Sequence, residues 1–142
     1  MRYHFKVHKD PDGIWAECLE LEGCNTQSED GTMENLEKNL AEALNLYLDE
    51  PNMNIIFPLP DNTLVGEDIA AVEVEPGIAF AVLLRAYRKS HNLKQKDMVA
   101  RLGFQNLFSY QRLEGKHPNP RLDTLALIQR KLPDFNVSML FK

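Results

Sequence analysis

Charge divides this chain of 142 residues into two halves, and that division constrains its architecture more than any other feature. Residues 1–77 contain 17 acidic and four basic side chains, a net charge of −13. Residues 78–142 contain four acidic and 12 basic side chains, a net charge of +8. Such asymmetry indicates two parts with different partners. The length suits two small domains, which we place at residues 1–75 and 78–142.

The first half is patterned as a small sheet with one helix. Polar and apolar side chains alternate from Arg2 to His8, which is typical of a strand with one buried face. Asp10-Pro11-Asp12-Gly13 is a predicted turn, and further strands are expected at residues 14–19, 24–28 and 69–74. Thr32 is the expected N-cap of a helix whose apolar stripe runs from Leu36 to Leu48. The order β-β-β-α-β predicts an α+β fold.

The second half is predicted to be all-helical. Helices are expected at residues 78–91 and 94–102, within 103–116, and from Asn119 onward. Asn119 is the expected N-cap of the last of these, with Pro120 at its first position and Leu122 on its apolar face. A short turn at residues 136–141 is expected to return apolar groups to the core. Two short helices joined by a tight turn with glycine are typical of a DNA-binding helix-turn-helix.

The stretch Gly103 to Lys116, GFQNLFSYQRLEGK, contains mostly neutral hydrogen-bonding side chains and a single acid, Glu114. Together with its neighbours, "LLRAYRKSHNLKQKDMVARLG…SYQRLEGKHPNPRLDTLALIQRKL", it resembles the Cro/C1-type helix-turn-helix domain. The shared features are a leading Leu-Arg helix, Leu-x-Gln, Leu-Gly, Arg-Leu-Glu and Asn-Pro. The resemblance covers about residues 79–142. It implies that Gln95 engages a DNA phosphate and that Arg88 and Glu114 form a partly buried ion pair, with Leu113 and Tyr110 packed inward.

The sequence does not decide the register of the reading helix, because the stretch from Gly103 to Glu114 is one residue longer than the corresponding stretch of the family. If Arg-Leu-Glu is the anchor, the helix begins near Asn106 and its first reader is Leu107; if Gly103 is the anchor, the first reader is Gln105. Arg112 suits guanine, Gln111 suits adenine, and Leu107 or Phe108 suits a thymine methyl group. Residues after the helix, including His117, suit phosphates. The candidate DNA-binding residues are Gln95, Gln105, Asn106, Leu107, Phe108, Ser109, Gln111, Arg112 and Lys116.

The first half resembles the HicB antitoxin family over about residues 1–75. The shared features are the hairpin with Asp12-Gly13 at its turn, the segment Leu21-Glu22-Gly23-Cys24, the capping Thr32 and the segment Pro58-Leu59-Pro60. Glu22 stands where the family usually has proline. The resemblance implies an incomplete ribonuclease-H-like domain that binds and covers a HicA toxin, a small basic mRNA endonuclease. It also implies that the second half represses the shared operon by binding, as a dimer or higher oligomer, to a palindromic operator.

Two other functions are alternative hypotheses for this sequence. A ligand-sensing transcription factor would need a pocket in the first half. A metal-dependent nuclease would need clustered carboxylates, but Asp10 and Asp12 suit a turn, and Glu17, Glu20 and Glu22 suit a solvated strand face. We therefore expect no catalytic residues, no metal site and no cofactor.

Several single residues carry expectations of their own. His4 and His8 are predicted at the surface, too far apart to share a metal, and Trp15 either in the core or facing a partner. Cys18 and Cys24 are expected to be partly buried and, in a cytosolic chain, reduced. A disulfide between them is an alternative that the sequence does not decide. No apolar run is long enough for a bilayer and none resembles a signal peptide, which predicts a cytoplasmic protein without membrane contact.

Overall fold

The computed structural model describes residues 1–142, which divide into two compact units. The first unit contains Met1–Leu48 and Pro58–Glu75, and the second contains Asp49–Phe57 and Pro76–Lys142. The boundary after Glu75 falls where the charge pattern changes. The segment Asp49–Phe57 differs from our assignment, because it belongs to the second unit although we placed it in the first domain. The first unit contains 15 acidic and four basic residues, a net charge of −11. The second unit contains six acidic and 12 basic residues, a net charge of +6.

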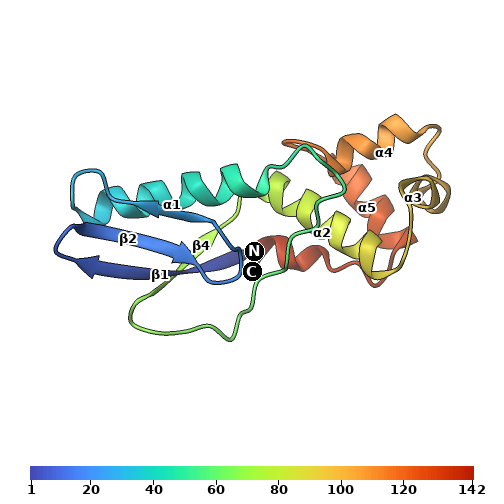
Figure 1. Ribbon diagram of the computed structural model, residues 1–142. Coiled ribbons are helices and arrows are strands. Elements are labelled where there is room, and N and C mark those ends of the chain that lie inside the picture. The colour runs from blue at the N-terminus through green and yellow to red at the C-terminus, as the bar shows by residue number, and fades with distance from the viewer. The chain divides into compact units, whose positions relative to one another are not determined.

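The first unit contains a four-stranded antiparallel sheet (Figure 1). Its strands are β1 (Arg2–Asp10), β2 (Gly13–Cys18), β3 (Asn25–Gln27) and β4 (Ile69–Glu73), in the spatial order β3-β2-β1-β4. β1 is central and pairs with β2 and β4 in registers that place Phe5 opposite Cys18 and Ala70. A helix, described next, lies between β3 and β4 in the sequence, so the predicted α+β fold and the order β-β-β-α-β are confirmed.

Helix α1 (Met33–Leu48) runs along one face of this sheet (Figure 1). Thr32 is its N-cap, since the threonine Oγ1 accepts a hydrogen bond of 3.2 Å from the Asn35 amide. The leucines spaced every four residues, Leu36, Leu40, Leu44 and Leu48, are all buried. They pack where the sheet presents Tyr3, Phe5 and Ala16, which are fully buried. The burial of both apolar faces forms the core of this unit.

His4 lies on the other face of β1 and is only 6% exposed, so its predicted surface position is wrong. The carboxylate of Glu20 explains the burial. It accepts hydrogen bonds from the His4 amide (2.8 Å) and from the Asp61 amide (3.1 Å), and it lies 2.7 Å from the His4 Nδ1. Glu20 therefore ties together β1 and the loop before β4. Strand alternation could not show these contacts, because Glu20 is 16 positions from His4 and 41 from Asp61 in the sequence.

The second unit is helical. It contains α2 (Pro76–Ser90), α3 (Gln95–Leu102), α4 (Leu107–Glu114), α5 (Leu122–Lys131) and a 3₁₀ turn η1 (Val137–Phe141). Its core side chains come from every element and include Leu84, Met98, Tyr110, Ile128, Leu132, Phe135 and Leu140. None of the helices in the chain has the length and apolar character that a bilayer crossing requires.

Helix α5 begins later than we predicted. Its N-cap is Arg121, so Asn119 is not the cap and Pro120 is not the first helical residue. Leu122 is 82% exposed and does not contribute to the apolar face. The reason is tertiary: the preceding residues are held in an extended path by other parts of the unit, as described below for His117 and Pro118.

Arg85 makes several of the contacts that attach the segment Asp49–Phe57 to the second unit. Its guanidinium is buried and donates to the carbonyl oxygens of Glu50 (2.5 Å), Asn52 (3.0 Å), Ile55 (3.3 Å) and Glu114 (2.8 Å). Burial lowers the pKa of Arg85 from its ordinary value, but the four carbonyl groups satisfy its donors. Arg85 thus joins the segment Asp49–Phe57 to the end of α4, and Arg88 adds a hydrogen bond of 3.3 Å to the Met53 carbonyl.

Candidate functional site

The turn between α3 and α4 sets the position of the candidate reading helix. Gly103 follows α3 in the left-handed region (φ +76°), where glycine is favoured, and its amide donates to the Val99 carbonyl. Asn106 then caps α4, since its side-chain oxygen accepts a hydrogen bond of 2.8 Å from the Ser109 amide. Leu107 is therefore the first helical residue, whereas Gln105 lies before the helix. The helix start near Asn106 agrees with anchoring on Arg-Leu-Glu.

The exposed side chains of this segment form one contiguous surface, which we call the α4 surface. It consists of the exposed residues Gln105, Asn106, Leu107, Phe108, Ser109 and Arg112. Leu107 is 42% and Phe108 68% exposed. The Arg112 guanidinium carbon lies 5.9 Å from the centre of the Phe108 ring, a cation–π contact. The surface combines hydrogen-bonding, cationic and apolar groups and contains no acid.

Glu114, the one acid of α4, faces inward and is fully buried. Its carboxylate accepts from the Arg88 Nε (2.7 Å) and Nη2 (2.9 Å) and from the Tyr110 hydroxyl. The hydrogen bond to Glu114 raises the pKa of Arg88 above its ordinary value. Burial, with the neighbouring carboxylate, raises the pKa of Tyr110. Arg88 and Glu114 thus join α2 to α4, and the acid is removed from the exposed surface.

Gln95 lies at the start of α3 and is half-buried. Its amide nitrogen donates to Glu114 (3.2 Å), and its amide oxygen accepts from the Gln111 Nε2 (3.0 Å). Because a carboxylate can only accept, Glu114 fixes which end of the Gln95 amide faces it. Gln95 in turn fixes Gln111, which leaves the Gln111 oxygen turned away from this network. The buried carboxylate therefore orients two amides in sequence.

The segment after α4 is fixed by two close contacts. Asp49, whose side chain is 5% exposed, accepts a hydrogen bond from the His117 amide (2.9 Å) and lies 2.9 Å from the His117 Nε2. The Pro118 carbonyl lies directly over Gly77, where a Cβ would collide with its oxygen. These contacts explain why the chain runs without helix from Gly115 to Arg121. Lys116, the last candidate DNA-binding residue, is exposed in this segment.

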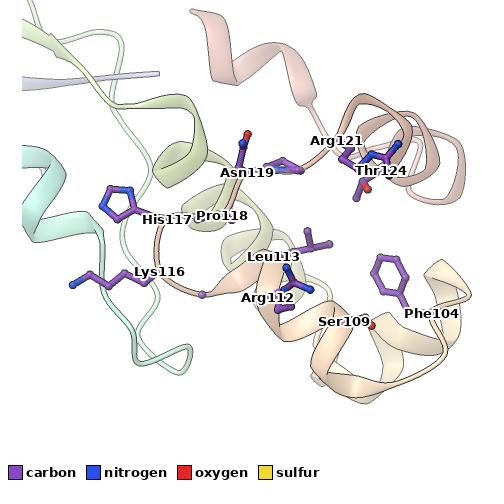
Figure 2. A pocket seen from close by; sticks show the side chains of 12 residues that line it. Phe104, Ser109, Arg112, Leu113, Lys116, His117, Pro118, Asn119, Arg121 and Thr124 are labelled. Carbon is purple, nitrogen blue, oxygen red and sulfur yellow. The ribbon is translucent and has the colours of Figure 1, made fainter.

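A hollow of about 660 Å³ lies between α4, this segment and the start of α5 (Figure 2). Arg112 and Ser109 border it from α4, Phe104 from the preceding turn, and Arg121 and Thr124 from the region of α5. Figure 2 shows Arg112 pointing toward this hollow, whereas Lys116 points away from it. The hollow thus places a second basic residue, Arg121, near the Arg112 side of the α4 surface.

The sequence did not single out two residues of this region. Arg85 and Asp49 are buried charges: Arg85 joins Asp49–Phe57 to the end of α4, and Asp49 holds His117 in the segment after α4. Arg85 had a detectable signal, because it is a charged residue at the end of the apolar run from Ile78 to Leu84. Asp49 had none, since an aspartate after a helix is ordinary turn chemistry.

In the first unit, three of the five acids considered as catalytic candidates contact other residues through their carboxylates, namely Asp10, Glu17 and Glu20. Asp10 accepts from the Asp12 amide (3.1 Å) and from the Trp15 Nε1 (3.0 Å). Trp15 is half-buried and stacks on His8, with ring centres 4.2 Å apart. Cys18 and Cys24 are buried free thiols. No group of three or more potential metal-binding side chains of the His, Cys, Asp and Glu types is present.

No model of a known protein family matches the chain, and no curated protein sequence matches it significantly.

Proposed function

We propose that the protein is a DNA-binding antitoxin and repressor. In this proposal the second unit is a Cro/C1-type helix-turn-helix domain formed around α3 and α4. The first unit is an incomplete ribonuclease-H-like domain of the HicB type that binds a small basic HicA-type toxin. The observation that carries the proposal is the α4 surface, which presents Arg112 and neutral hydrogen-bonding groups while the only acid of α4 is buried.

The chemistry of the α4 surface supports DNA binding. Side chains of the N-terminal part of a recognition helix reach base edges in the major groove, and Leu107, Phe108 and Ser109 form the first turn of α4. The second unit has a net charge of +6. Phosphate neutralisation by basic side chains supplies most of the sequence-independent affinity for DNA. The unit thus has both a surface suited to bases and the charge suited to phosphates.

The charge of the first unit supports a basic protein partner. Its net charge of −11 would repel nucleic acid but would speed and orient the approach of a basic toxin. In the proposal this unit inhibits the toxin by covering its active site and contributes no catalytic residue of its own.

A palindromic operator follows from the size of the reading element. One helix of eight residues contacts only a few base pairs, and two-fold pairing of two copies doubles the contacts. We therefore propose that the protein binds its operator as a homodimer or higher oligomer.

The DNA-binding role is tested by the variant Arg112→Ala. Its affinity for the operator of the shared operon should fall by about 1–3 kcal/mol, because a bidentate contact to guanine is lost. Fluorescence anisotropy with operator and scrambled duplexes at several salt concentrations measures this change. Lys38→Ala removes an exposed positive charge from the first unit and should leave the affinity unchanged. An equal loss on both duplexes would show that Arg112 contacts only phosphate.

The antitoxin role is tested with the product of the neighbouring reading frame. If that frame encodes a short basic protein with mRNA endonuclease activity, it should co-purify with the full chain and lose its activity in the complex. Binding should weaken as salt rises, because the attraction is electrostatic. A purified chain that neither binds nor silences this product would disprove the antitoxin role while leaving DNA binding intact.

A small-molecule-sensing transcription regulator is the second candidate. The observation in its favour is a hollow of about 390 Å³ in the first unit, bordered by Val7, Met33 and Ile69 and by charged residues. Hollows of this size accommodate small ligands. A ligand that raises the melting temperature of the purified chain, and changes its DNA affinity without a protein partner, would favour this candidate.

A further inference from the structure

The α4 surface contains a pair of side chains that form one contact with each other. Phe108 and Arg112 are four residues apart on α4, so they lie on the same face of the helix. The guanidinium carbon of Arg112 is 5.9 Å from the centre of the Phe108 ring. We call these two residues the Phe–Arg pair. An aromatic face beside a guanidinium limits the rotamers of both, which prepares the pair for binding as a unit.

Neither member of the pair is used by the fold. Phe108 is 68% exposed, although it is one of the largest apolar side chains of the unit. Arg112 forms none of the seven ion pairs of the protein. Its guanidinium borders the hollow in Figure 2, so its N–H groups remain accessible. The pair therefore offers an exposed aromatic ring and a forked donor close together at the surface.

The two groups match two features of the major groove. A guanidinium donates in bidentate fashion to the O6 and N7 of guanine, and an apolar side chain contacts the 5-methyl group of thymine. Successive bases rise about 3.4 Å along a strand. Because the guanidinium carbon lies only 5.9 Å from the ring centre, the two base features that these groups contact must also be neighbours. Adjacent base pairs meet that condition.

We propose that the Phe–Arg pair reads a guanine next to a 5-methylpyrimidine, with Arg112 on the guanine and Phe108 on the methyl group. This inference rests on the proposed DNA-binding function and names its base specificity. The recognised group is the methyl carbon, so thymine and 5-methylcytosine are both suitable and unmethylated cytosine and uracil are not. Binding would then respond to cytosine methylation at this step.

The first test is selection from a randomised duplex library with the full chain. Bound duplexes should be enriched in a guanine adjacent to a thymine. Selection with Phe108→Ala should keep the guanine and lose the preference for thymine. Selection with Arg112→Ala should lose the guanine. Leu122→Ala removes a comparably exposed leucine from α5 and should select the same sequences as the unmodified chain.

The second test changes single atoms in an enriched duplex. Replacing the thymine by uracil removes only the methyl group and should weaken binding about fourfold, the factor for one buried methyl group. The same replacement should have less than about a 1.5-fold effect on Phe108→Ala, which lacks the ring. Replacing the thymine–adenine pair by a cytosine–guanine pair should weaken binding. Methylation of that cytosine at C5 should then raise the affinity about fourfold.

The outcomes separate the inference from the proposed function. Suppose that the chain enriches a duplex. If it then binds the uracil duplex as tightly as the thymine duplex, or if the uracil replacement weakens binding by the same factor for Phe108→Ala and for the unmodified chain, base reading by the pair is disproved and DNA binding stands. If no duplex is enriched and binding to DNA is absent at low salt, the proposed function is disproved as well. Circular dichroism of each variant verifies that it is folded.

Discussion

At the scale of single residues, the second unit depends on buried charged side chains whose polar atoms are hydrogen-bonded. Glu114 has no exposed surface and receives hydrogen bonds from Arg88, Tyr110 and Gln95. The Arg88–Glu114 ion pair could be predicted from the resemblance to the Cro/C1 type, because both residues match positions of that pattern. The role of Gln95 in the same network did not follow from it, since the hydrogen bonds of Gln95 depend on where α4 lies.

Substitution of this buried acid should be costly. Glu114→Gln leaves the Arg88 guanidinium without its counter-charge, and breaking a buried pair in this way typically costs about 3–5 kcal/mol. Urea unfolding followed by far-UV circular dichroism measures the loss. Asp123→Asn changes a carboxylate that is 90% exposed and should alter the free energy of unfolding by less than about 0.5 kcal/mol. Equal effects of the two variants would contradict the role given to Glu114.

His91 gives the second unit a pH dependence. Its Nδ1 lies 2.8 Å from the Tyr87 carbonyl oxygen and its Nε2 lies 2.7 Å from an Asp134 oxygen, so both nitrogens face acceptors. The Tyr87 carbonyl and then the Asp134 carboxylate raise the pKa of His91 above its ordinary value. The contribution to stability is therefore complete below the unfolded pKa of about 6.5 and is lost as the pH rises through the folded pKa.

An NMR titration of His91 checks this dependence. The midpoint should lie above about 6.5 in the unmodified chain and should fall in Asp134→Asn, which removes one acceptor charge. Asp123→Asn removes an exposed acid elsewhere in the same unit and should leave the midpoint unchanged. A midpoint at or below the ordinary value in the unmodified chain would rule out the stabilising role.

At the scale of elements, the sequence predicted most helices and strands, and it failed where distant contacts decide the path. The strands of the hairpin and helix α1 follow from alternation, capping and leucine spacing, all of which are local. The start of α5 does not, because Asp49 and Gly77 hold His117 and Pro118 outside the helix. The register of α4 could be narrowed to two choices, and the Asn106 cap favours the one beginning at Leu107.

Gly77, in the first turn of α2, is an element-scale test of this packing. Alanine normally stabilises a helix relative to glycine by about 0.5–1 kcal/mol. At this position the added methyl group would collide with the Pro118 carbonyl, so Gly77→Ala should instead destabilise the unit by about 1–3 kcal/mol. Thermal unfolding measures the sign of the change. Lys89→Ala, at an exposed position of the same helix, should be nearly neutral.

At the scale of the whole molecule, the second unit is assembled from two separate parts of the chain. Asp49–Phe57 contributes carbonyl groups that satisfy Arg85, and Asp49 also pairs with His117. Charge composition placed a boundary near Pro76, but it could not place this segment, because its two acids resemble those of the first half. Its contacts in three dimensions, including those with Arg85, Arg88 and His117, assign it to the second unit.

This arrangement predicts a difference between two fragments. A fragment of residues 49–142 retains the segment, whereas a fragment of residues 78–142 leaves Arg85 with three carbonyl partners fewer. Unpaired buried donors are costly, so the shorter fragment should unfold at lower urea concentration and show less helical signal. Equal midpoints for the two fragments would mean that the segment does not stabilise the second unit.

The interleaved path of the chain also has a consequence for proteolysis. The two units are joined by three peptide connections, after Leu48, after Phe57 and after Glu75. A protease that cuts any one of them cannot separate the units, because the others still link them. A cut after Leu48 leaves β1 paired with β4, and β4 remains covalently connected to both flanking segments. Degradation of one unit alone therefore requires several cuts or the unfolding of the chain from an end.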